Sequence, residues 1–169
     1  MQKEISEKFG DAVWSAPAKA LHITLFDWLA PLVDYGKDKD ELFKQIFPEY
    51  DRVVSQALKT AGPIAVTFMA VKVAPAAIFI VGHDNGQFEQ IRNYFLDNVE
   101  LLPDTKRPPT IIHSTIARFT KEIELEEIEQ FIENLTVSFT ETIDTFRLIK
   151  ETVDPLLEFE VIKEYKLGI

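Results

Sequence analysis

Residues 111–119 of the chain read IIHSTIARF, an apolar run that carries a histidine and a threonine two positions apart. Its content of β-branched residues predicts a buried strand. Side chains alternate between the two faces of a strand, so His113 and Thr115 should leave it on the same face. A titratable imidazole beside a hydroxyl donor on one rigid element suits chemistry at a negatively charged oxygen.

The same pattern occurs a second time, in residues 20–26, which read ALHITLF. Two of the three histidines, His22 and His113, therefore precede a threonine by two positions. Threonine fills 12 of the 169 positions. Chance alone would then pair two of three histidines in this way in about 1–2% of sequences of the same composition. The repetition favours a functional interpretation of both motifs.

The elements predicted around the two motifs also repeat. Hydrophobic periodicity predicts a strand over 20–28, helical segments on both sides of Pro48, strands over 64–73 and 77–81, a helix after residue 86, a strand over 111–119, a helix over 120–135, and strands over 137–150 and 156–166. The expected class is α+β, with two pseudo-symmetric antiparallel sheet lobes, helices outside and a central cleft. No Gly/Ser linker separates the lobes, so residues 1–169 should form a single bilobal domain.

Charge and composition limit the partners. The net charge is −10, which disfavours long nucleic acid, because binding it depends on Lys and Arg that neutralise phosphates. A small nucleotide or a short oligonucleotide is the expected substrate. The chain has no cysteine and begins with charged residues, which favours a cytoplasmic location. Lys72 and Pro75 interrupt the apolar segment 64–81, so no membrane span is expected.

Paired histidines can divide acid and base catalysis, because an imidazole has an ordinary pKa near ~6.5. Across a cleft, one would accept a proton from water or a ribose hydroxyl, and the other would donate a proton to the departing oxygen. Thr24 and Thr115 would hydrogen-bond the non-bridging phosphate oxygens. This chemistry requires no cofactor and no metal, and the spacing of His22, His83 and His113 does not support a zinc site.

The two His-x-Thr motifs, with Arg107-Pro108 ahead of the second, resemble those of the 2H phosphoesterase superfamily, which includes the bacterial RNA 2′,3′-cyclic phosphodiesterases called 2′-5′ RNA ligases. The resemblance implies a metal-independent phosphodiesterase that cleaves 2′,3′-cyclic phosphates, 2′-5′ linkages or related small cyclic phosphodiesters. It implies catalytic roles for His22 and His113. It also implies a phosphate-site role for Arg118, although strict alternation places Arg118 on the face opposite His113. The geometry of the two motifs needs only one chain, so a monomer is expected.

Two further aromatic residues are candidates for the site. Phe26 and Trp28 share the face of His22 in the predicted strand and could stack on a nucleobase, although core packing is the alternative. Two other functions also stay open. One is a non-catalytic nucleotide- or phosphate-binding module of the same fold. The other is a structural α+β protein in which both His-x-Thr pairs are buried hydrogen-bonding pairs.

Overall fold

The computed structural model describes residues 1–168. In chain order its helices and strands are α1 (Gln2–Phe9), β1 (Val13–Ser15), α2 (Lys39–Lys59), β2 (Ile64–Ala74), β3 (Ala77–His83), α3 (Gln87–Asn98), β4 (Ile112–Phe119), α4 (Leu125–Ile132), β5 (Phe139–Ile143), β6 (Thr145–Val153) and β7 (Glu158–Lys166). Short 3-10 turns span Gly10–Ala12 and Ala18–Ala20. The class is α+β with antiparallel sheets, which confirms the class predicted from the sequence.

The larger sheet has five strands in the order β1-β4-β3-β2-β5, and every neighbouring pair is antiparallel. Strands β2 and β3 form the hairpin that the apolar segment 64–81 predicts, and β4 lies between β3 and the short edge strand β1. Alternating burial along β3, with Ile78 and Ile80 inside, shows why this segment forms a strand with one face on the core.

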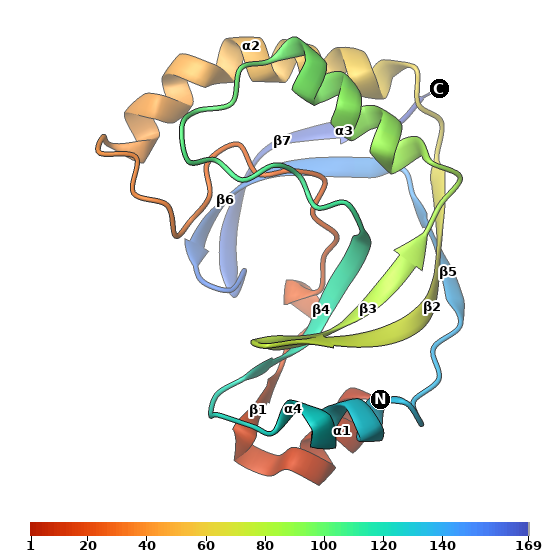
Figure 1. Ribbon diagram of the computed structural model, residues 1–169. Coiled ribbons are helices and arrows are strands. Elements are labelled where there is room, and N and C mark those ends of the chain that lie inside the picture. The colour runs from red at the N-terminus through yellow and green to blue at the C-terminus, as the bar shows by residue number, and fades with distance from the viewer. Residues whose placement is uncertain (169) are drawn as a thin grey trace.

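Helices cover the two sheets on different sides. Figure 1 shows α1 and α4 together beneath the larger sheet, where Ile5, Ile128 and Ile132 are buried. It shows α2 and α3 on the opposite side of the molecule, near the two-stranded sheet of β6 and β7. The contact between α2 and β7 includes Asp51, whose carboxylate accepts a hydrogen bond from Tyr165 at 2.7 Å.

Three predicted elements differ from the structure. Residues 20–28 form no strand, so the prediction of a first motif strand is wrong. Helix α2 runs continuously past Pro48, because its buried stripe extends on both sides of that residue and packing outweighs the local cost of about 3 kcal/mol. The predicted strand 137–150 is two strands: β5 pairs with β2 in the larger sheet, and β6 pairs with β7.

Among residues 1–168, no helix combines the length and the apolar character needed to cross a membrane.

Candidate functional site

The second motif lies at the centre of the larger sheet. His113 and Thr115 are half-buried on one face of β4, whereas Ile112 and Ser114 are buried on the other, which confirms the predicted alternation. Their cross-strand neighbours on β3 are Val81 and Phe79, respectively. The face that carries His113 and Thr115 is called the motif face below.

A β-bulge changes the position of Arg118. Ala117 pairs with Ile78 and Thr115 pairs with Phe79, so Ile116 is an extra residue on β4 with no partner of its own. The bulge reverses the alternation beyond it, as bulges beside functional sites often do. Arg118 is therefore on the motif face with Thr115, and it is exposed. The expectation from strict alternation that Arg118 faces away from His113 is wrong.

The first motif is held by an arginine instead of a β-ladder. Arg92 on α3 is only 5% exposed, and its guanidinium donates to the backbone carbonyls of Thr24 at 2.7 Å, Leu25 at 2.8 Å and Ile111 at 3.3 Å. One side chain thus ties the segment of His22 to the start of β4. The buried guanidinium also lies over the ring of Phe88, at 5.2 Å from its centroid.

The charge of His22 acts on His113. Burial lowers the pKa of His113, and the positive charges of His22 and Arg92 lower it further, while a hydrogen bond to the backbone of Ile111 opposes the change. His113 is therefore kept neutral at neutral pH. His22 is exposed, and its Nδ1 lies 2.8 Å from the carbonyl oxygen of Ala20. Since a carbonyl only accepts, Nδ1 carries the proton and Nε2 is available for chemistry.

A carboxylate lies close to His22. Asp27 is exposed to solvent, yet surrounding protein atoms desolvate it enough to raise its pKa, and the charge of His22 acts against that rise. An ionised Asp27 would attract a protonated His22.

Of the two aromatic candidates for base stacking, Trp28 lies in the core and Phe26 is half-buried against it. Trp28 is 6% exposed and packs against Tyr50 at 5.5 Å and Phe43 at 6.0 Å between ring centroids. Phe26 has one face covered by Phe95, in a parallel stack at 4.1 Å. The core alternative is therefore the better description of Trp28. The aromatic ring that does adjoin the motif is Phe79, whose centroid is 5.5 Å from that of His113.

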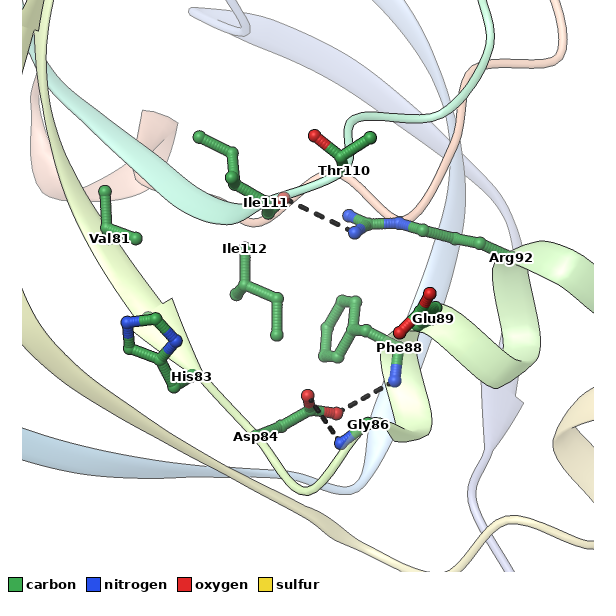
Figure 2. A pocket seen from close by; sticks show the side chains of 11 residues that line it. Val81, His83, Asp84, Gly86, Phe88, Glu89, Arg92, Thr110, Ile111 and Ile112 are labelled. Atoms are coloured by element: carbon green, nitrogen blue, oxygen red, sulfur yellow. Dashed lines mark hydrogen bonds between the residues drawn. The ribbon is translucent and has the colours of Figure 1, made fainter.

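A pocket of about 290 Å³ lies at the end of β3, beside the start of β4. Figure 2 shows Arg92 reaching across it to Ile111, and Asp84 accepting hydrogen bonds from the backbone of Gly86 and Phe88. His83 lines this pocket, but neither His22 nor His113 does. The pocket thus does not contain the histidine pair.

Two residues of the site, Arg92 and Phe79, were not predicted from the sequence. Arg92 lies one helical turn after Phe88, on the apolar side of α3, and a lone arginine at that position was the available signal. The position of Phe79 beside His113 depends on the pairing of β3 with β4, which no local pattern reveals. Within residues 1–168, no three metal-ligating side chains are grouped to hold an ion.

Comparison with known proteins identifies the family. A sequence model of the 2′-5′ RNA ligase superfamily matches residues 3–155. The crystal structure of TT0787 from Thermus thermophilus is similar in fold, with a TM-score of 0.65 and 15% sequence identity over 98% of this chain and 89% of that one. No curated protein matches the chain. Because the match spans most of the sequence, including both His-x-Thr motifs, the chain belongs to the 2′-5′ RNA ligase superfamily, whose members are 2H phosphoesterases.

Proposed function

We propose that the protein is a phosphodiesterase that cleaves 2′,3′-cyclic phosphates, 2′-5′ linkages or related small cyclic phosphodiesters, with His22 and His113 as the acid–base pair. Family membership supports a phosphodiesterase-type enzyme that acts on RNA or nucleotide substrates. The observation that carries the finer proposal is Arg92, which links the backbone of both motif segments through three hydrogen bonds.

The lowered pKa of His113 supports its role as the general base for hydrolysis. In that direction His113 takes a proton from water, the water oxygen bonds to phosphorus, and one ester P–O bond of the cyclic phosphate breaks. His22, protonated on both ring nitrogens in this step, donates the proton of Nε2 to the departing ribose oxygen, while its Nδ1–H donates to the carbonyl of Ala20. In the reverse direction the two roles exchange.

Charge that develops on the non-bridging oxygens requires donors. Thr24 and Thr115 supply hydroxyl groups, and Arg118 supplies a guanidinium from the same face of β4 as Thr115. Arginine suits this position because its planar donors match phosphate oxygens in pairs. The net charge of −10 favours a small nucleotide or a short oligonucleotide as the substrate.

The test is hydrolysis of 2′,3′-cyclic nucleotides and of 2′-5′ and 3′-5′ dinucleotides, with EDTA present, by the wild type, His22→Ala and His113→Ala. Far-UV circular dichroism reports whether each variant folds. We expect turnover of the cyclic or 2′-5′ compounds to fall by about 10²–10⁴-fold in each folded variant, since each histidine supplies one proton transfer. Nucleotide binding without turnover by the wild type would instead assign the non-catalytic binding role.

A further inference from the structure

A row of three side chains crosses the larger sheet at right angles to its strands. Lys72 on β2 pairs with Phe79 on β3, and Phe79 pairs with Thr115 on β4. Residues paired across adjacent strands point to the same side of a sheet, so all three lie on the motif face. Lys72 is exposed, and Phe79 and Thr115 are half-buried. The row therefore extends the motif face away from the histidine pair.

The charges on this face contrast with those of the whole protein. Although the net charge is −10, Lys72 and Arg118 both lie on the motif face, Lys72 across the strands from Thr115 and Arg118 further along β4. In the described part of the chain, neither takes part in an ion pair. Two cations without carboxylate partners create a local positive potential that attracts an anionic ligand.

The distance across the row, from Lys72 to Thr115, suits a ligand that is larger than one phosphate group. Neighbouring strands lie about 4.8 Å apart, which places the backbone of Lys72 roughly 10 Å from that of Thr115. The ring of Phe79 fills the interval and also contacts the imidazole of His113 edge to face. Aromatic rings are suited to packing against a sugar or base, and the flexible stem of lysine lets its ammonium follow a phosphate.

We propose that Lys72 binds a second phosphate of the substrate, separated by one nucleoside from the phosphate at Thr115, and that Phe79 packs against this nucleoside. The inference deepens the proposed function, on which it rests for the location of the reacting phosphate. It names the substrate class as a nucleotide with at least two phosphate groups. The second group is a terminal 5′-phosphate or the next phosphodiester of a short oligonucleotide.

The test is a binding measurement, so it does not depend on turnover. Isothermal titration calorimetry compares adenosine 2′-monophosphate with adenosine 2′,5′-bisphosphate, and with a diadenosine that carries a terminal 2′-phosphate and a free 5′-hydroxyl. The proteins are the wild type, Lys72→Gln, Lys72→Arg and Lys3→Gln. Lys3→Gln is the matched control, because this lysine on α1 is 86% exposed and the charge removed is the same.

We expect the wild type to bind one of the two larger probes at least about tenfold more tightly than the monophosphate, the size expected for one charged hydrogen bond. The probe that binds more tightly than the monophosphate shows whether the second phosphate is terminal or internal. Lys72→Gln should lose this preference, Lys72→Arg should retain most of it, and Lys3→Gln should keep it fully. Equal affinity of the wild type for all three probes, or an undiminished preference in Lys72→Gln, overturns the inference. Hydrolysis by the wild type separately decides the proposed function.

Discussion

His113 combines a half-buried position with a pKa lowered by burial and by nearby positive charge. Between that lowered value and the ordinary value near ~6.5, the unfolded chain binds more protons than the folded one. The stability of the fold is therefore greatest above this window and decreases as the pH drops through it. The lowered pKa that suits His113 to act as a base thus also lowers the stability of the fold in mildly acidic solution.

His113→Gln should remove this loss of stability at mildly acidic pH. From about pH 7.5 to about pH 5, the free energy of unfolding should fall less in the variant than in the wild type, as measured by urea denaturation at each pH. Carboxylates titrate in both proteins alike, including Asp27, whose pKa is raised by desolvation, so the difference between the two proteins reports on His113. An identical pH dependence in both proteins would show that His113 is not desolvated as described.

Arg92 connects three parts of the fold, because its hydrogen bonds join α3 to the first motif segment and to the start of β4. Arg92→Met would leave three carbonyl groups without their donor, at about 1–3 kcal/mol for each one that stays buried. Of the three residues that carry these carbonyls only Leu25 is buried, so we expect the free energy of unfolding to fall by about 1–3 kcal/mol and kcat/KM to fall with it. Urea denaturation and kinetics check both. A variant as stable and as active as the wild type would show that the three hydrogen bonds do not set the site.

The bulge at Ile116 leads to a prediction for Arg118. Because it puts Arg118 on the motif face, Arg118→Gln should lower kcat/KM for a cyclic nucleotide by about 10–100-fold, the loss expected for a charge-assisted contact. Arg118→Lys should recover part of this loss by restoring the charge without the paired donors. Since the side chain is exposed and forms no ion pair within residues 1–168, the thermal unfolding midpoint should hardly change. Full activity in Arg118→Gln would instead place Arg118 outside the site.

Across the whole molecule, the overall charge and the local site favour different ligands. The net charge of −10 repels a long polyanion, while Lys72 and Arg118 attract one or two phosphates at the motif face. At low salt, a 20-nucleotide RNA with a 2′,3′-cyclic end should therefore be a poorer substrate than a dinucleotide with the same end. The difference in kcat/KM should shrink as added salt screens the repulsion. A longer RNA that reacts faster at low salt would indicate an extended basic surface instead.

The sequence predicted the sheet face that carries His113 and Thr115, because a two-residue period is a local property of one strand. It did not predict the position of Arg118, because the bulge at Ile116 arises from pairing with β3. The predicted strand over residues 20–28 failed for a related reason: the carbonyls of Thr24 and Leu25 bind a distant arginine rather than a neighbouring strand. Local patterns thus identified the motifs, and long-range contacts determined how they are held.

If His22 and His113 act together in one reaction, a comparison of single and double variants will show it. The measurement is kcat/KM on the best cyclic or 2′-5′ substrate for the wild type, His22→Ala, His113→Ala and the double variant. Residues that act as a unit give strongly non-additive losses. We therefore predict that kcat/KM of the double variant is no lower than that of the less active single variant. A double loss equal to the product of the single losses, or wild-type activity in either single variant, would contradict a shared mechanism.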